Sequence, residues 1–154
     1  MAQKTVPKRI FIFIFLLFFC FPAFCLEKDE LQISSPSSPD SYNFTIDLAS
    51  SKEDLANGLM HRKIIAEDYG MLFDFGSEKP AFMWMKNTLL PLDMLFINAE
   101  GVIVKIAKNT VPESEEVIFH PTPVRAVLEI KGGISDILGL KEGYIVKNKI
   151  FQSK

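Results

Sequence analysis

The chain has 154 residues, is 48% hydrophobic, and carries 17 basic against 19 acidic residues, a formal charge of −2. These values fit one small globular domain and exclude the strongly basic composition typical of a nucleic-acid-binding protein. Both cysteines, Cys20 and Cys25, fall within the first 25 residues, so the rest of the chain has no thiol for a disulfide or a thiolate metal site.

The N-terminus has the composition of a secretory signal peptide over residues 1–25. Three basic residues precede an apolar run at 10–21, Pro22 ends the run, and cleavage is predicted before Leu26. The run is shorter than the roughly 20 apolar residues of a spanning helix. We therefore predict an exported protein, periplasmic or extracellular, that meets a membrane only through an uncleaved leader. Cleavage leaves 14 basic and 19 acidic residues, and this acidic balance predicts no nucleic-acid partner.

The segment that follows the leader is rich in serine and proline. Residues 33–40 read Ile-Ser-Ser-Pro-Ser-Ser-Pro-Asp, a composition that buries little apolar surface. We therefore predict a linker over residues 26–41 and one folded domain over residues 42–151.

The first half of this domain combines strand patterns with one short helix. Apolar residues alternate with polar ones over residues 42–48, the period of a half-buried strand. Ser51 followed by Asp54 resembles a helix N-cap with an acidic first turn, and predicts a short helix. Residues 71–75 and 81–85 are strand-like and flank a Gly-Ser-Glu-Lys-Pro stretch, so they predict a hairpin.

The second half reads as further short strands. Residues 93–98 and 102–108 flank Ala-Glu-Gly and predict a second hairpin, and residues 117–119, 124–131 and 144–150 predict single strands. A short helical turn over residues 134–138 follows Gly132-Gly133. The expected fold class is α+β, a small, mainly antiparallel β-barrel-like domain with two short helices.

Several separated motifs resemble the DUF192 family of bacterial and archaeal proteins. They are Gly58-Leu59-Met60-His61-Arg62, Gly70-Met71-Leu72-Phe73, Trp84-Met85-Lys86-Asn87-Thr88, Pro91-Leu92-Asp93, and Val127-Leu128-Glu129-Ile130 with Gly132-Gly133. The resemblance implies a compact, barrel-like α+β domain, often behind a signal peptide, and no agreed activity. Relatives commonly have Phe-Trp-Met where this chain has Met83-Trp84-Met85, and often Gly-Asp where it has Gly143-Tyr144, so no role is carried onto Tyr144.

The stretch between Phe82 and Asp93 is the candidate site, because it places the only tryptophan beside several polar groups and a proline. One interpretation is a mouth of the barrel that binds a small polar or anionic ligand, or an envelope partner. The other is packing, with Asp93 accepting hydrogen bonds from loop amides or pairing with Arg62 or Lys86. The candidate ligand-binding residues are Arg62, Trp84, Lys86, Asn87, Thr88 and Asp93.

The leading functional hypothesis is non-catalytic binding, without a cofactor and without a metal site. The alternative is an enzyme of unknown class acting on envelope carbohydrate or peptide, with Asp93 as acid/base and Lys86 or Arg62 stabilising charge. A lesser alternative is copper binding by thioethers, which suit Cu(I). Its candidate ligands are Met60, Met71, Met83, Met85 and Met94. Glu129 is expected to face solvent or the barrel rim, since it alternates with Leu128 and Ile130.

Overall fold

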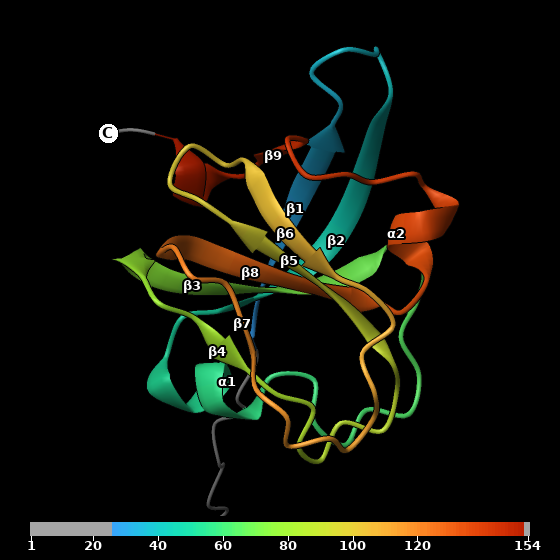
Figure 1. Ribbon diagram of the computed structural model, residues 1–154, viewed down its shortest axis with the longest axis vertical. Coiled ribbons are helices and arrows are strands. Elements are labelled where there is room, and N and C mark those ends of the chain that lie inside the picture. Colours follow the sequence, from blue (N-terminus) through green and yellow to red (C-terminus); the bar gives the residue numbers. More distant parts are fainter. Residues whose placement is uncertain (1–25, 153–154) are drawn as a thin grey trace, which may run out of the picture.

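A strongly curved seven-stranded sheet dominates the computed structural model, which describes residues 26–152 (Figure 1). The predicted signal peptide, residues 1–25, lies outside the described residues. The strands of this sheet are β1 (Glu27–Ser34), β2 (Ser41–Ala49), β3 (Tyr69–Lys79), β5 (Leu92–Ile97), β6 (Ile103–Ala107), β8 (Val124–Lys131) and β9 (Ile145–Lys147). The remaining elements are β4 (Phe82–Met83), β7 (Ile118–Phe119), α1 (Lys52–Asn57), α2 (Ile134–Ile137) and a 3-10 turn, η1 (Lys149–Phe151).

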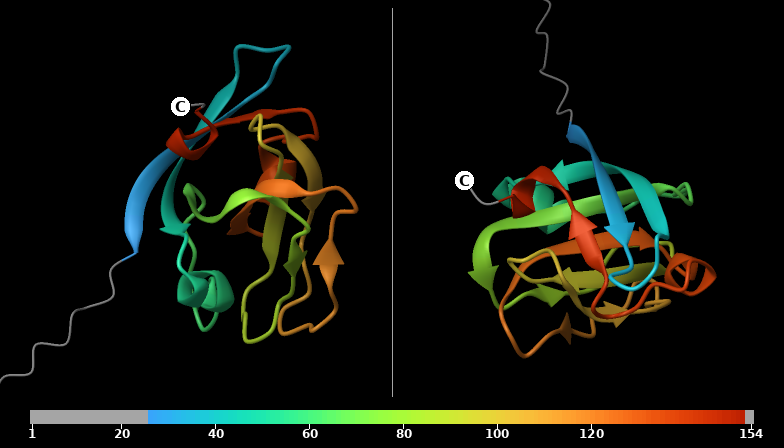
Figure 2. Two further views of the ribbon diagram at one scale, coloured as in Figure 1. Left: turned by 90° about the vertical axis from the view of Figure 1, so that its left-hand side faces the viewer. Right: turned by 90° about the horizontal axis from the view of Figure 1, so that it is seen from above.

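The order of the strands is β6-β5-β8-β3-β2-β1-β9, and its two ends approach each other. A bridge joins Val102, next to β6, to Ile145 of β9, and the amide of Ile103 donates to the Tyr144 carbonyl at 2.9 Å. Neighbouring strands are antiparallel except β2 and β3, which are parallel and connected through α1. The result is the nearly closed, barrel-like α+β domain that the sequence predicts, seen from two further sides in Figure 2.

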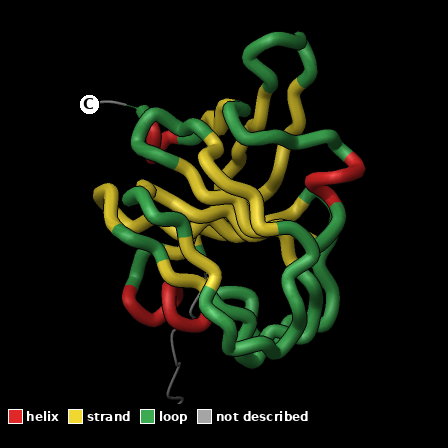
Figure 3. The backbone as a smooth tube through the Cα atoms, viewed as in Figure 1, coloured by secondary structure: helices red, strands yellow, loops and turns green. Residues whose placement is uncertain are grey.

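Local sequence signals account for the connections. The hydroxyl of Ser51 accepts a hydrogen bond from the Asp54 amide at 3.1 Å, the predicted cap of α1. The predicted hairpin of β5 and β6 is present, with Gly101 at a φ of 78° in its turn. Figure 3 shows that the long loops run together in the lower part of the molecule, where α1 also lies.

The hairpin predicted for residues 71–75 and 81–85 is wrong. β3 runs on to Lys79 and pairs with β8 over Gly70–Asp74 and again at Lys79, so the glycine-containing stretch is a bulge within β3 and does not turn the chain back into a hairpin. β4 pairs instead with β7 in a separate two-stranded sheet, with Phe82 opposite Phe119. This small ribbon covers part of the outer face of the main sheet, and its position shapes the candidate site.

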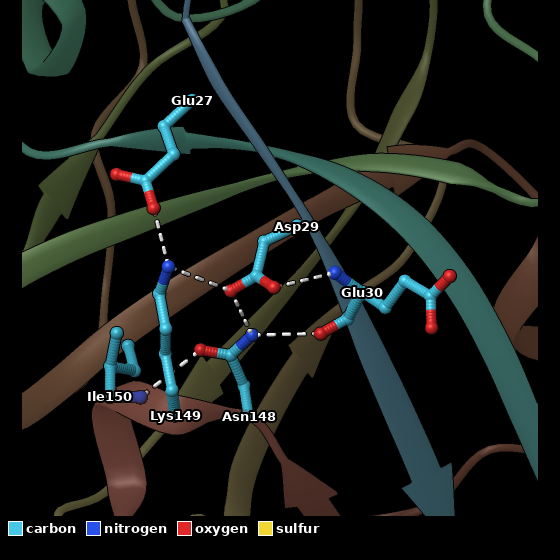
Figure 4. A network of polar contacts seen from close by, with 6 residues as sticks. All are labelled: Glu27, Asp29, Glu30, Asn148, Lys149 and Ile150. Carbon is cyan, nitrogen blue, oxygen red and sulfur yellow. Dashed lines mark hydrogen bonds and ion pairs between the residues drawn. The ribbon is translucent and has the colours of Figure 1, made fainter.

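Residues 27–34 are a strand and not the linker that the sequence predicts. β1 pairs with β2 over its full length and with β9, and Leu31 and Ile33 are buried. Polar contacts fix it to the C-terminal turn: the Asn148 side-chain amide donates to Asp29 at 3.0 Å, and Lys149 pairs with Glu27 and Asp29 (Figure 4). The serine- and proline-rich stretch is only the loop between β1 and β2.

Leu31→Ala should therefore lower the free energy of unfolding by about 3 kcal/mol, because it leaves a cavity in the barrel core. Urea denaturation of the variant and the parent protein measures this difference. Glu30→Ala, an exposed position on the same strand, is the matched control and should change stability by less than about 0.5 kcal/mol. Equal, small effects of both substitutions would contradict a structural role for β1.

Two apolar clusters occupy opposite faces of the sheet. The inner one fills the barrel with residues from nearly every strand, among them Ile33, Phe44, Leu72 and Leu128, and α2 adds Ile134 at one end. The outer cluster lies on β3, β5 and β8 and is covered by α1, the β4–β7 ribbon and loops. Because side chains alternate along a strand, neighbouring residues of β5 and β8 belong to different faces.

Candidate functional site

A pocket of about 100 Å³ lies on the outer face of the sheet, where the end of α1 faces β4. Its walls come from the last turn of α1 and the loop after it, from β3, β4 and β8, and from the loop that follows β4. The lining residues are Leu55, Ala56, Asn57, Gly58, Leu59, Met60, Phe73, Phe82, Met83, Trp84, Thr88 and Glu129.

Glu129 is the only ionisable side chain among these lining residues, and it is 4% exposed. It lies on β8, directly opposite Met71 of β3 and Met94 of β5, so apolar side chains flank it on both sides. Within residues 26–152, no hydrogen bond or ion pair holds its carboxyl group. The expectation that Glu129 faces solvent or the barrel rim is therefore wrong.

Burial raises the pKa of Glu129 to about 8, because the low-polarity surroundings disfavour the charged carboxylate. The carboxyl group is therefore largely protonated at neutral pH in the ligand-free protein. Buried polar groups normally have a hydrogen-bond partner, so a carboxyl group that faces a cavity without one is a strong indication of a functional site.

Gly58 lets the chain pass closely over this carboxyl group. It ends α1 with a φ of 49°, and its amide donates to the Asp54 carbonyl at 2.9 Å. A Cβ atom at this position would lie 2.8 Å from Cζ of Phe73 and 3.7 Å from Oε2 of Glu129. A larger residue would strain the turn and push against the pocket wall.

The mouth of the pocket is aromatic and open to solvent. Trp84 is 51% exposed and Phe82 is 67% exposed. The ring of Phe82 lies 6.2 Å from that of Phe119 on β7, which extends the apolar surface away from the pocket. Large aromatic side chains exposed together beside a cavity are typical of a binding surface.

The structure brings two of the predicted site residues, Trp84 and Thr88, into this pocket. Lys86 and Asn87 instead occupy a tight turn, closed by the Thr88 amide donating to the Met85 carbonyl at 3.0 Å. Asn87 adopts a φ of 55°, and its carbonyl accepts from the His61 amide. Lys86 lies 3.6 Å from the exposed Glu115, so neither residue faces the pocket cavity.

Asp93 does not belong to the pocket. It pairs in register with Ile130, so it lies on the face of the sheet opposite to Glu129, and it is fully buried. Its oxygens accept hydrogen bonds from the amides of Asn109 at 2.8 Å, Gly133 at 3.1 Å and Ser135 at 2.8 Å. Asp93 therefore makes the contacts of the packing interpretation, in which its carboxylate accepts hydrogen bonds from loop amides, and it does not line the pocket.

Arg62 pairs with Asp47 on β2, at 2.8 Å, and not with Asp93. The same carboxylate accepts a hydrogen bond from the hydroxyl of Tyr69, and the guanidinium group lies 5.1 Å from the centre of that ring. Burial and the bond to Asp47 raise the pKa of Tyr69 above its usual range. This ion pair engages Arg62, which is not among the residues that line the pocket.

The five methionines considered for copper divide between the outer core and the pocket. Met71, Met85 and Met94 are buried in the outer core, whereas Met60 and Met83 line the pocket. Residues 26–152 contain no cluster of three or more His, Cys, Asp or Glu side chains that could hold a metal ion. None of the helices between residues 26 and 152 has the length and apolar character needed to cross a bilayer.

The candidate ligand-binding residues predicted from the sequence do not include Glu129 and Phe82, both of which line the pocket. The sequence does indicate that Glu129 is buried. Its neighbours Val127, Leu128 and Ile130 are apolar on both faces of the strand, a pattern typical of an interior strand that is buried on both sides. A carboxyl group in such a strand has to be buried. Phe82 has no comparable signal, because its exposure depends on the pairing of β4 with β7.

The comparisons with known proteins agree on the fold and on one family. The model of the DUF192 family, described as "Uncharacterized ACR", matches residues 35–147. A solved structure from Sinorhizobium meliloti 1021, described as a "putative transcription regulator", is 42% identical with a TM-score of 0.77; the match covers 79% of this chain and 94% of that one.

A second solved structure is a protein of unknown function from Novosphingobium aromaticivorans DSM 12444. It is 33% identical with a TM-score of 0.77, and the match covers 83% of this chain and 90% of that one. No curated protein matches the chain. The family model spans most of the chain and includes both sides of the pocket, from Gly58 to Glu129. The chain therefore belongs to the DUF192 family.

Proposed function

We propose that this protein is an exported, non-catalytic binding protein that holds a small ligand in the pocket beneath Trp84. The observation that carries the proposal is the combination of a buried carboxyl group without a partner, Glu129, and an exposed aromatic rim formed by Trp84 and Phe82. A ligand group that bonds to the carboxyl and lies against the rings would satisfy both features at once.

The size of the pocket limits what it can hold. Typical small-molecule pockets measure about 300–1,000 Å³, whereas this cavity measures about 100 Å³. Only a few non-hydrogen atoms fit inside, so the pocket takes the head of a ligand while the remainder lies over the rim. The apolar surface of Phe82 and Phe119 is in place to contact that remainder.

Binding, and not catalysis, is favoured by the isolation of the carboxyl group. The lining residues include no second carboxylate, no histidine and no lysine that could complete an acid–base or nucleophile–base pair with Glu129. Asp93, which would act as acid/base in the enzyme hypothesis, bonds three amides on the other face of the sheet.

Intrinsic fluorescence tests the proposal, because Trp84 is the only tryptophan in the chain. In a screen of small alcohols, amines, amides and sugars, a ligand that enters the pocket should shift the emission of Trp84 to shorter wavelength and raise the melting midpoint. Phe82→Ala should weaken binding about tenfold, since it removes part of the apolar rim.

Lys86→Ala is the matched control, because Lys86 is close to Trp84 in sequence but pairs with Glu115 outside the pocket. It should leave the fluorescence titration unchanged. The proposal is wrong if no compound changes both the emission and the melting midpoint, or if Lys86→Ala abolishes binding while Phe82→Ala leaves it intact.

A further inference from the structure

The chemical character of the pocket narrows the class of ligand. Its only ionisable group is an acid, Glu129, and no cation among the described residues balances that acid. A buried carboxylate without a counter-ion is unfavourable, and a ligand that supplies the positive charge removes the penalty. An anionic ligand, in contrast, would meet like charge in a low-polarity site.

The cations nearest in the fold are already paired elsewhere. On β8, Lys131 lies two residues along from Glu129 and pairs with Glu67 at 2.9 Å. Arg62 pairs with Asp47 on β2, which lies beyond β3 on the same face of the sheet as Glu129. On β6, Lys105 donates to the carbonyl of Phe119 at 2.6 Å.

The other elements around the pocket add no free cation. The charged residues of α1, which are Lys52, Glu53 and Asp54, occupy its first turn, whereas its last turn forms the pocket wall. On β3 the carboxylate of Asp74 pairs with Arg125 on the opposite face from Met71. His61, which follows Met60, is exposed. The positive charge must therefore come from the ligand.

The rest of the lining is suited to a cation of low hydration. The faces of aromatic rings attract ammonium groups, and Trp84, Phe82 and Phe73 all border the cavity. The thioethers of Met60 and Met83 are polarisable and carry no competing charge. A carboxylate at the bottom of an aromatic pocket is the arrangement that recognises an organic ammonium ion.

We propose that the pocket binds the ammonium head of an alkylammonium compound, with Glu129 as its carboxylate acceptor and the alkyl chain lying over Phe82 and Phe119. This assignment rests on the proposed function, since it names the ligand of the same pocket. The volume of about 100 Å³ admits the head group and the first carbons of the chain. The remaining carbons of the alkyl chain lie outside the cavity, against the exposed rings of Phe82 and Phe119.

Binding of such a ligand is coupled to the release of a proton. The ligand-free carboxyl group is protonated below its pKa of about 8, and the ammonium ion binds the carboxylate. Formation of the complex therefore converts Glu129 to its anion and releases one proton to solvent. The dissociation constant should rise tenfold for each pH unit below about 8 and should level off above it.

Butylammonium and 1-butanol are the test pair, because they share an alkyl chain and differ in charge. Each is titrated into the purified protein at pH 6, 7, 8 and 9, with Trp84 emission as the readout; an alkylammonium ion stays charged across this range. Butylammonium should bind about 50-fold more tightly at pH 8 than at pH 6, because half of the Glu129 carboxyl is still protonated at pH 8. Butanol should show no such dependence.

Glu129→Gln should abolish the pH dependence and weaken butylammonium binding at least tenfold at pH 8. Glutamine keeps the shape and neutrality of the protonated acid, so the variant should fold; should it fail to fold, the pH profile of the parent protein decides. His61→Gln should leave the profile unchanged, which shows that the pH dependence does not depend on this neighbouring side chain.

The outcomes distinguish this inference from the proposed function. If butanol binds as tightly as butylammonium, and Glu129→Gln retains both, the pocket binds neutral ligands and the ammonium assignment is overturned while the binding function stands. If butylammonium does not bind at any pH, the assignment is also overturned, and the wider screen decides the function separately.

Discussion

Asp93→Ala is expected to lower the free energy of unfolding by about 4 kcal/mol. Asp93 is fully buried and accepts hydrogen bonds from three main-chain amides, on the loops at Asn109 and Gly133 and at the start of α2. A hydrogen bond to a charged group contributes about 1.5–3 kcal/mol, and amides left without an acceptor in a buried site add a further penalty. The loss should be visible as a large decrease in the urea midpoint.

Asp93→Asn separates the structural role from a catalytic one. Asparagine keeps one oxygen for the amides of Asn109 and Gly133 but turns an NH₂ group toward the amide of Ser135, where two donors oppose each other. We expect a smaller loss of about 2–3 kcal/mol. Asp136→Asn, an exposed partner of Lys108, is the matched control and should change stability by less than about 1 kcal/mol.

The ligand titration gives the decisive readout for Asp93. Since Asp93 and Glu129 lie on opposite faces of the sheet, folded Asp93→Asn should bind pocket ligands as the parent protein does. A variant with unchanged stability but lost function would instead support the role of Asp93 as acid/base. The same comparison tests whether the loops that Asp93 holds have any direct part in the site.

Local chemistry explains which parts of the fold could be predicted. The cap at Ser51, the turn at Gly101 and the helical turn after Gly133 each depend on a few adjacent residues, and the structure contains all three. Strand pairing depends on residues far apart in sequence. The turn-like composition before Pro80 therefore suggested a β3–β4 hairpin, although β3 pairs with β2 and β8.

β1 was not predicted as a strand because a serine- and proline-rich stretch follows it in the sequence. Only Leu31 and Ile33 give it an apolar face, and the serines and prolines that follow dominate the composition of the segment. The strand is stabilised by partners from distant parts of the chain: β2, β9 and the polar side chains at Asn148 and Lys149. A pattern of adjacent residues in the sequence cannot predict partners that are distant along the chain.

The sequence predicts where the candidate site lies, but not which residues form it. Trp84 and Thr88 do line the pocket, as the motif around them suggested. Asp93 was grouped with them by proximity in sequence, although the curvature of the sheet and the alternation of β5 place it on the inner face. Glu129, about 45 residues away from Trp84, lines the pocket because β8 is an interior strand, paired with β5 on one side and β3 on the other.

Glu129→Gln is expected to stabilise the protein at pH 8 and above while leaving its stability near pH 4.5 almost unchanged. The pKa of Glu129 is about 8 in the folded protein, against an ordinary value of 4.5. Between these two values the folded state holds one proton more than the unfolded state. The free energy of unfolding of the parent protein should therefore fall by about 1.4 kcal/mol for each pH unit, and remain level outside this range with respect to this group.

Urea denaturation at pH 4.5, 6, 7, 8 and 9 measures this dependence. The difference in stability between Glu129→Gln and the parent protein should grow to roughly 4 kcal/mol by pH 8, because glutamine carries no charge to bury. Contributions from groups other than Glu129 are common to both proteins and cancel in the difference. Glu115→Gln, at an exposed carboxylate, should show no growing difference.

A ligand that supplies a positive charge should reverse this loss of stability. If an ammonium ion pairs with the Glu129 carboxylate, butylammonium should stabilise the parent protein more at pH 8 than at pH 6, and should stabilise Glu129→Gln little at either pH. Parallel pH profiles for the two proteins would show that the carboxyl group is solvated in the folded state. In that case the Glu129 carboxylate would not destabilise the folded protein, and a cationic ligand would gain nothing by pairing with it. The selectivity of the pocket would then depend on its aromatic rim alone.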